Sequence, residues 1–293
     1  MRPAHPYPDA ILLRILATLF AVVTLSAPAV AGEGQGAAPP APQPGSAQSA
    51  PGGQRPGLGV PGAPAAPDHL DLAIGGGVVF APRPYVGANA TVIPIPVISL
   101  RYKRLYADGI RGGVQALRRG LLTGNVFLQA NFEGLEADHS AFLEGMEDRS
   151  MSADAGAELV YRARPIGFRV GVLSDVLGRN KGQEVVVQAV TGAPLWSRGF
   201  LLASVGPRWL SANRVDYEYG VRESEATPAR PAYTGTSSWN WDLTLGATIR
   251  IAGKWSLFTL FSREAFGSPI EQSPIVDGGA AYSLISSLTY ALR

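Results

Sequence analysis

The sequence contains no cysteine, which excludes disulfide bonds and cysteine-ligated metals and leaves no cysteine for the acyl anchor of a lipoprotein. Charged residues are scarce, at 16% of the chain, against about 25% in typical soluble domains. The net charge of +2, without a motif that interleaves aromatic and basic residues, gives no case for nucleic-acid binding. After the N-terminus no apolar run approaches the length of a transmembrane helix. Few charges together with 35 glycines are typical of a membrane β-barrel, which faces lipid and turns sharply many times.

The first 31 residues have the pattern of a secretory signal peptide. Arg2 and Arg14 supply positive charge, residues 15–25 supply a short apolar core, and Ala29-Val30-Ala31 supplies a small-x-small cleavage site. The core is too short to span a bilayer comfortably, which disfavours the alternative of an uncleaved anchor helix. The sequence therefore predicts export from the cytoplasm and a mature protein that begins at Gly32.

Residues 32–67 are rich in proline and glycine, and Glu33 and Arg55 are their only charged residues. Such a segment cannot bury enough apolar surface to offset the entropy lost on ordering. We predict a disordered linker, which either reaches toward cell-wall polymer or a periplasmic partner or serves as a spacer without a partner. The alternating segments that follow predict that residues 68–293 form the barrel.

The clearest strand lies at residues 239–251, where alternate side chains are chemically opposite. One set is apolar: Trp239, Trp241, Leu243, Leu245, Ala247, Ile249 and Ile251. The other set is polar or small: Asn240, Asp242, Thr244, Gly246, Thr248 and Arg250. A strand sorts these sets onto two faces, whereas a helix would scatter them. The length and the two leading tryptophans favour a strand that crosses a bilayer over a strand of a soluble sandwich.

The same period of two recurs at residues 122–133, 151–162 and 282–292. We expect short turns near 164–165, 195–199 and 252–253, and long or polar connections at 136–150, 176–182, 222–237 and 267–279. Outer-membrane barrels have short periplasmic turns and long external loops, so this alternation predicts a C-terminus in the periplasm.

The predicted number of strands depends on Pro94-Ile95-Pro96. In an up-and-down barrel, two connections on the same side of the membrane are separated by an even number of strands. The obvious count between the predicted external loops at 81–88 and 136–150 is three. A turn at these prolines, which cannot donate to a central ladder, adds a strand and makes the number even. The division gives short strands at 89–93 and 97–106 and a further turn at Asp108-Gly109. The sequence thus predicts an all-β fold, a transmembrane antiparallel up-and-down β-barrel of twelve strands, or of ten if the Pro94 region is a bulge.

Seven charged side chains are predicted to share the lumen. They are Arg101, Asp154, Glu158, Arg162, Arg169, Asp242 and Arg250. Because both signs are present, one interpretation is a network of mutual ion pairs that fills the interior. The other is a narrow pore for a small polar solute, since twelve strands lie between filled barrels of about eight strands and channels of about sixteen or more.

Catalysis and metal binding receive little support from the residues. His139-Ser140 is a conceivable hydrolase pair, but adjacent residues rarely reach the geometry of a nucleophile and its base. Glu144 and Glu147 make the same predicted external loop acidic, but the spacing lacks the turn glycine and rhythm of a calcium loop. We therefore predict a solvated acidic loop and a protein that is not an enzyme and has neither a cofactor nor a metal.

Seven short motifs occur in order along the chain. They read FAPRPYVGA at 80–88, PIP at 94–96, VGP at 205–207, DYEYGV at 216–221, PAY at 231–233, WSL at 255–257 and SPIV at 273–276. In this order they resemble the MltA-interacting-protein (MipA)/OmpV family of outer-membrane proteins, across about residues 70–293. We expect the motif residues Pro82, Tyr85, Gly87, Pro94, Pro96, Ser273 and Pro274 to shape turns rather than to bind a ligand.

The resemblance implies an outer-membrane barrel without agreed catalytic residues. One branch of the family scaffolds murein synthesis by holding a lytic transglycosylase and a bifunctional penicillin-binding synthase together, and other members are described as adhesins, porin-like proteins or resistance-linked proteins. Two departures are that this chain ends Leu292-Arg293 instead of in an aromatic residue, and that the proline-rich linker is not a usual family feature.

The leading hypothesis is a non-enzymatic scaffold or interaction protein in the cell outer membrane. Its expected partners are outer-membrane lipid and envelope proteins such as murein synthases or hydrolases. The alternative function is a narrow pore or channel for a small polar solute.

Overall fold

The computed structural model describes residues 70–131 and 134–292. The predicted signal peptide and the predicted linker at 32–67 lie outside the described residues.

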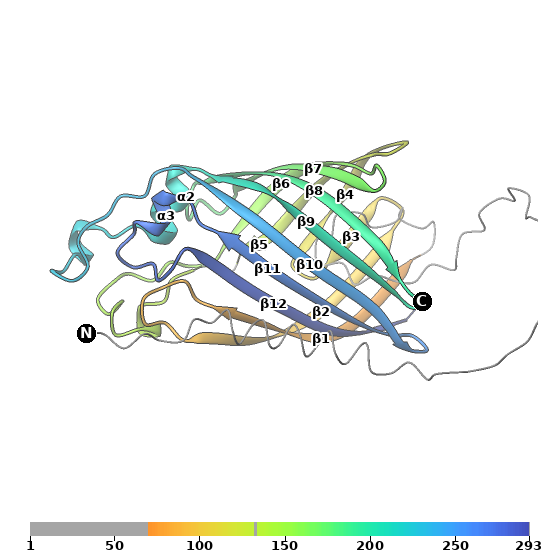
Figure 1. Ribbon diagram of the computed structural model, residues 1–293, viewed down its shortest axis with the longest axis horizontal. Coiled ribbons are helices and arrows are strands. Elements are labelled where there is room, and N and C mark those ends of the chain that lie inside the picture. The colour runs from red at the N-terminus through yellow and green to blue at the C-terminus, as the bar shows by residue number, and fades with distance from the viewer. Residues whose placement is uncertain (1–69, 132–133, 293) are drawn as a thin grey trace, which may run out of the picture. The chain divides into compact units, whose positions relative to one another are not determined.

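Twelve strands of the described residues form one closed antiparallel barrel, in which β1 pairs with both β2 and β12 (Figure 1). The strands are β1 (Asp71–Pro82), β2 (Ala90–Tyr102), β3 (Leu105–Asp108), β4 (Arg111–Arg119), β5 (Leu122–Asn131), β6 (Ser152–Tyr161), β7 (Ile166–Asp175), β8 (Gln183–Leu195), β9 (Gly199–Leu210), β10 (Ser238–Ala252), β11 (Trp255–Ala265) and β12 (Ala280–Ala291). Each strand pairs with its neighbours in sequence, so the predicted up-and-down barrel of twelve strands is confirmed.

The predicted turn at Pro94-Ile95-Pro96 is wrong, because β2 runs without interruption from Ala90 to Tyr102. The backbone carbonyl of Ile98 accepts a hydrogen bond from the N–H of Gly109, so the even-numbered residues of β2 direct their backbone groups toward β3. On that side β3 pairs only with Ser99–Tyr102, and no described residue pairs with residues 90–97. Pro94 and Pro96 therefore occupy positions where no ladder donor is needed, which a strand tolerates. The predicted number of twelve strands is still correct, because two-residue turns after Tyr102 and Asp108 set off the short strand β3 between β2 and β4.

The strands have a polar inner face and an apolar outer face, as β10 shows most clearly. Trp239 and Trp241 are each 59% exposed, whereas Asn240 between them is fully buried. The exposed apolar side chains recur on the outer face of the other strands, including Ile98, Leu128, Leu159 and Val172. A band of apolar side chains around a closed barrel with a polar interior is the arrangement of a barrel in lipid.

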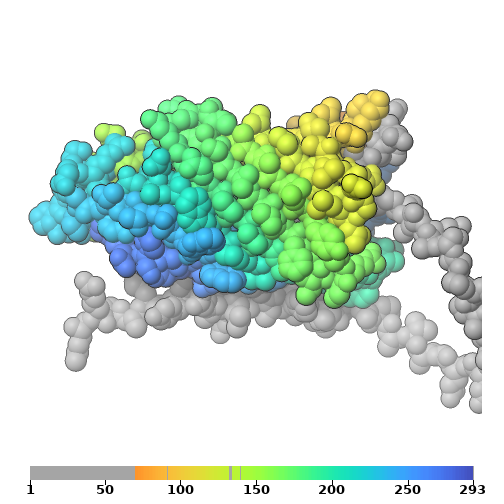
Figure 2. Space-filling view, turned by 90° about the horizontal axis from the view of Figure 1, so that it is seen from above, coloured from red at the N-terminus to blue at the C-terminus, as the bar shows by residue number. Residues whose placement is uncertain are grey.

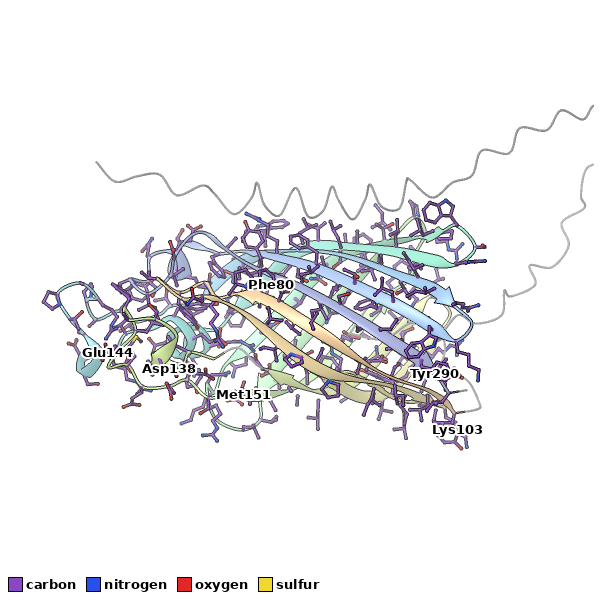
Figure 3. The ribbon with its side chains drawn as sticks, turned by 90° about the horizontal axis from the view of Figure 1, so that it is seen from below. Phe80, Lys103, Asp138, Glu144, Met151 and Tyr290 are labelled. Carbon is purple, nitrogen blue, oxygen red and sulfur yellow. The ribbon has the colours of Figure 1, made fainter. Side chains whose placement is uncertain are left out.

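The connections differ in length at the two ends of the barrel. At one end the turns are tight, and Gly120 and Gly253 adopt the positive φ that such turns require. At the other end lie the longer connections, with the 3-10 helices η1 (Ala137–His139) and η2 (Glu223–Glu225) and the helices α2 (Ala212–Tyr219) and α3 (Ser268–Glu271). Figure 3 places Lys103 and Tyr290 at the first end and Asp138 and Glu144 at the second. By the loop-length rule the first end is periplasmic and the second is external.

None of the helices among the described residues has the length and apolarity needed to cross a membrane.

Candidate functional site: the barrel interior and its outer cap

Glu158 on the inner face of β6 joins two arginines. One of its carboxylate oxygens, Oε2, lies 3.2 Å from Arg111 Nη1 and 2.9 Å from Arg169 Nε. The other oxygen accepts a hydrogen bond from the amide of Asn125. All three charged residues are buried, and the alternation of β4, β6 and β7 directs them inward. One carboxylate thus pairs with two buried cations. Removing any of the three charges would leave a buried charge without its partner.

Neutral side chains complete the hydrogen bonding of both arginines. Arg111 Nε and Nη2 donate to Gln129 Oε1 at 2.9 and 2.6 Å, and Arg169 Nη1 donates to Gln188 Oε1 at 3.2 Å. The guanidinium of Arg111 also lies 4.0 Å from the ring centre of Phe127, an inward-facing aromatic residue of β5. The cluster thus connects the inner faces of β4, β5, β6, β7 and β8 by hydrogen bonds.

A second pair lies on β2 and β3. Arg101 Nη2 lies 3.0 Å from Asp108 Oδ2, and the hydroxyl of Ser99 donates to Asp108 Oδ1 at 2.8 Å. The register of the two short paired segments sets Ser99 opposite Asp108.

Helix α2 inserts an arginine into the external half of the interior. Arg214 Nη1 lies 3.2 Å from Asp154 and 3.4 Å from Glu184, and Arg214 Nε lies 3.2 Å from Glu218 one turn later on the helix. These four residues are all buried. The helix therefore belongs to the barrel interior as well as to the external loops.

Arg208 on β9 holds a neighbouring group of carboxylates. Its Nε lies 2.8 Å from Asp242 and 3.6 Å from Glu184, and its Nη1 lies 3.6 Å from Glu264. Glu184 thus contacts both Arg208 and Arg214 and links the two groups.

The external connections pack into an apolar cluster above these ion pairs. We call residues 83–89, 134–151, 211–237 and 266–279 the outer cap. Its buried members include Tyr85, Leu135, Leu143, Val215, Tyr219, Phe266, Ile270 and Ile275. The ring of Tyr219 lies 6.1 Å from that of Tyr85 and 5.7 Å from that of Phe266, centre to centre. Four connections far apart in sequence therefore share one small core. Figure 2 shows the cyan residues of the connection after β9 gathered at this end.

Buried ion pairs hold the cap together. Arg149 donates through Nη1 and Nη2 to the two oxygens of Glu225, at 3.0 and 2.9 Å, and both side chains are almost fully buried. Burial opposes ionisation of Glu225, but hydrogen bonds from Arg149 and from two backbone N–H groups outweigh it and lower the pKa of Glu225 from 4.5 to about 2. Arg230 donates to the backbone carbonyls of Glu225, Phe142 and Glu144. These bonds join the connection after β5 to the connection after β9.

The motif residues that we expected to shape turns lie in two different settings. The loop at 83–89 meets the loop at 266–279, where the N–H of Val86 donates to Ile275 at 2.9 Å and that of Asp277 donates to Pro84 at 2.8 Å. Tyr85 is buried there, and the hydroxyl of Ser273 donates to the carbonyl of Tyr219 at 2.6 Å. Pro82 ends β1, Gly87 has a positive φ, and Pro274 lies in the second loop. Pro94 and Pro96, by contrast, lie within β2.

The structure brings five of the seven predicted lumen residues into ion pairs: Arg101, Asp154, Glu158, Arg169 and Asp242. Arg162 lies in the turn after β6, and Arg250 is exposed near the periplasmic end of β10. Arg111, Glu184 and Arg208 were missed, although each occupies an inward position in its strand. Arg214 could not be found from strand alternation, because it comes from a loop helix.

The predicted external acidic loop lies in the cap, with Asp138 and Glu144 exposed. Within the described ranges no group of three or more His, Cys, Asp or Glu residues is arranged to hold a metal ion.

A family model described as MltA-interacting protein MipA matches residues 74–292, which covers the barrel from β1 to β12. The chain belongs to this family. The predicted resemblance to MipA and OmpV proteins is therefore confirmed, as is the predicted location, the outer membrane.

Among relatives of this MipA family member, the MltA-interacting protein of Escherichia coli strain K12 is 24% identical over 228 residues, which are 75% of this chain and 89% of the relative. Outer membrane protein OmpV of Vibrio cholerae serotype O1 is 24% identical over 169 residues, 56% of this chain and 63% of the relative. A solved outer membrane channel from Pseudomonas putida F1 has a TM-score of 0.45 at 11% identity and covers 82% of this chain and 100% of that channel.

Proposed function

We propose that this chain is a non-enzymatic scaffold or interaction protein of the outer membrane, and that murein synthases or hydrolases are its partners. The observation that carries the proposal is the set of buried ion pairs in the interior. Glu158 and Arg214 each bind several buried partners of opposite charge, and the outer cap covers the external end with an apolar core. Such an interior favours a function that uses the outside of the barrel.

The partner class is suggested by a relative. The Escherichia coli protein named MltA-interacting protein aligns along 75% of this chain, at 24% identity. The surfaces available to a partner in the periplasm are the tight turns and the segment at 32–67, which precedes β1 in the sequence. We favour the segment at 32–67 as the part that reaches the partner, because its composition is that of an extended chain.

Affinity capture from envelope extracts tests this function. We expect the detergent-solubilised full chain to retain a murein synthase or hydrolase, and we expect a chain that lacks residues 32–67 to lose it. A chain in which the same segment is replaced by glycine and serine of equal length is the matched control for spacing. If neither the full chain nor the control retains a murein enzyme, the murein function is wrong.

The alternative function is a narrow pore for a small polar solute. The observation in its favour is that the inner wall is polar, with Asn125, Gln129 and Gln188 beside the charged groups. Planar-bilayer conductance of the same preparation separates the two functions. The scaffold predicts silent bilayers when insertion is efficient, and discrete conductance steps would favour the pore.

A further inference from the structure

The turns at the periplasmic end of the barrel all have basic residues in them or beside them. We call these residues the basic rim: Lys103 and Arg104 after β2, Arg119 at the end of β4, Arg164 after β6, Arg198 after β8, and Lys254 after β10. Figure 3 shows Lys103 at the end of the barrel opposite Glu144. Strands far apart in the sequence thus present the same sign of charge at one end.

Acidic residues are concentrated at the other end. The cap carries exposed Glu136, Asp138, Glu144, Glu147, Asp148, Asp216, Glu223, Glu271 and Asp277. Near the basic rim, Asp108 is buried in its pair with Arg101, and Asp71 begins β1. The net charge of +2 therefore hides a strong separation of charge along the barrel axis.

The charges of the rim are not neutralised within the barrel. All of its members are exposed, and none of them forms an ion pair with a carboxylate of the described residues. Lys254 donates to the carbonyl of Leu292 at 3.2 Å and Lys103 lies 5.2 Å from the ring centre of Tyr102, contacts that leave the positive charge uncompensated. Exposed charges of one sign gathered at one end attract anions from outside the chain.

The level of the rim in the membrane indicates which anions lie next to it. Outward-facing aromatic residues adjoin the basic residues in sequence: Tyr102 precedes Lys103, Trp196 is two residues before Arg198, and Trp255 follows Lys254. Trp196 is 68% exposed and Trp255 is 43% exposed, and the ring centres of Trp255 and Tyr290 are 5.1 Å apart. Such aromatic residues mark the level of the lipid headgroups. Because the turns are tight, the guanidinium and ammonium groups stay at this level.

We propose that the basic rim binds the anionic phospholipid headgroups of the periplasmic leaflet and so fixes the depth of the barrel in the membrane. A soluble acidic partner would reach basic residues more easily on long connections that extend beyond the headgroups than on tight turns at the headgroup level. The inference does not depend on the scaffold function, since it concerns the barrel and its lipid.

Native mass spectrometry of the full-length protein tests the proposal. The folded protein is equilibrated with equal amounts of phosphatidylglycerol and phosphatidylethanolamine that have the same acyl chains. We expect phosphatidylglycerol to be retained preferentially. Each basic residue near an anionic surface contributes about fivefold to binding, so Lys103→Gln with Arg104→Gln, both exposed in the turn after β2, should lower the preference about 25-fold.

The matched control removes two exposed basic residues from the external end, Arg179→Gln with Lys181→Gln, and should keep the preference. A second rim variant, Arg198→Gln with Lys254→Gln, tests turns in another part of the ring. Heat-modifiable electrophoretic mobility verifies that each variant is folded. Equal retention of the two lipids by the unchanged protein, or an equal loss in the control, overturns the proposal.

Soluble polyglutamate and inorganic phosphate form separate arms of the experiment. If polyglutamate binding falls in the rim variants while the lipid preference does not, the rim serves an acidic protein and the lipid proposal is wrong. If free phosphate displaces phosphatidylglycerol at equal concentration, the rim has no specificity for a membrane headgroup, which also overturns it.

Discussion

Glu158 is the carboxylate that pairs with two buried arginines. Its Oε2 atom lies within 3.2 Å of nitrogen atoms of both Arg111 and Arg169. Without the carboxylate, two buried guanidinium groups would face each other with only neutral partners. Breaking a buried pair from one side leaves an uncompensated charge, which costs far more than the intact pair contributes.

We predict that Glu158→Gln lowers the free energy of unfolding by about 3–5 kcal/mol. Urea unfolding in detergent, followed by tryptophan fluorescence and by electrophoretic mobility, measures the change. Glu144→Gln removes one exposed carboxylate from the outer cap and is the control, with an expected change within about 0.5 kcal/mol. Equal stabilities of the two variants would show that the Glu158 cluster does not hold the barrel together.

Individual inward residues were predictable only where the strand register was clear. Asp154, Glu158 and Asp242 belong to strands with a strict period of two, and the sequence placed their neighbours on the opposite face. Arg208 keeps the alternation of β9, but the inward positions of that strand mix apolar Leu202 and Leu210 with polar Ser204, so the sequence alone does not separate the two faces. Arg214 reaches the interior from α2. The alternation of residues within strands cannot predict that a helix of a loop inserts a side chain into the barrel.

For strand β2 the sequence predicted the wrong bounds, although the predicted total of twelve strands was right. The sequence divided it at Pro94 because proline interrupts a central ladder. The actual strand continues because its side toward β3 is paired only from Ser99 onward, so the upper half is an edge among the described residues. The edge exists because β3 is too short to pair with residues 90–97 of β2. The sequence of residues 90–97 gives no indication of the length of β3.

We predict that Pro94→Ala with Pro96→Ala destabilises the barrel by about 1–3 kcal/mol per added N–H, because each new donor points to the unpaired side of β2. Pro194→Ala is the control. It also removes a proline from a strand, but it is exposed near the periplasmic turn after β8, where water can accept the new donor. The denaturant midpoint of refolded protein measures both changes. A double variant as stable as the control would mean that the new donors find acceptors.

At the scale of the whole molecule, the outer cap determines whether the interior is accessible from outside. The alternation of short turns and long connections was predictable, and it oriented the barrel. The packing of four connections into one core was not, because it joins Tyr85, Leu143, Tyr219 and Ile275 from distant parts of the sequence. Four of the seven family motifs, at 80–88, 216–221, 231–233 and 273–276, contribute residues to the cap, so the resemblance marked the cap without revealing its structure.

The cap should open in acid, because Glu225 is ionised within it. Hydrogen bonds from Arg149 and from backbone N–H groups overcome the effect of burial and lower the pKa of Glu225 from 4.5 to about 2. A group whose pKa is lower in the folded state stabilises that state above its unfolded pKa. The contribution is therefore complete above about pH 4.5, is lost as the pH falls toward 2, and is on the order of 3 kcal/mol.

Hydrogen exchange of residues 134–151 and 211–237, corrected for its intrinsic pH dependence, measures the opening. We expect protection to fall between about pH 4.5 and 2 in the unchanged protein, while the strands stay protected. Glu225→Gln should be less protected at neutral pH and should lose this pH dependence, since its side chain cannot ionise. Glu223→Gln, an exposed carboxylate two residues away, should behave as the unchanged protein does. If Glu225→Gln keeps the full acid transition, another group controls the cap, and the Arg149–Glu225 pair is not what holds the connections after β5 and β9 together.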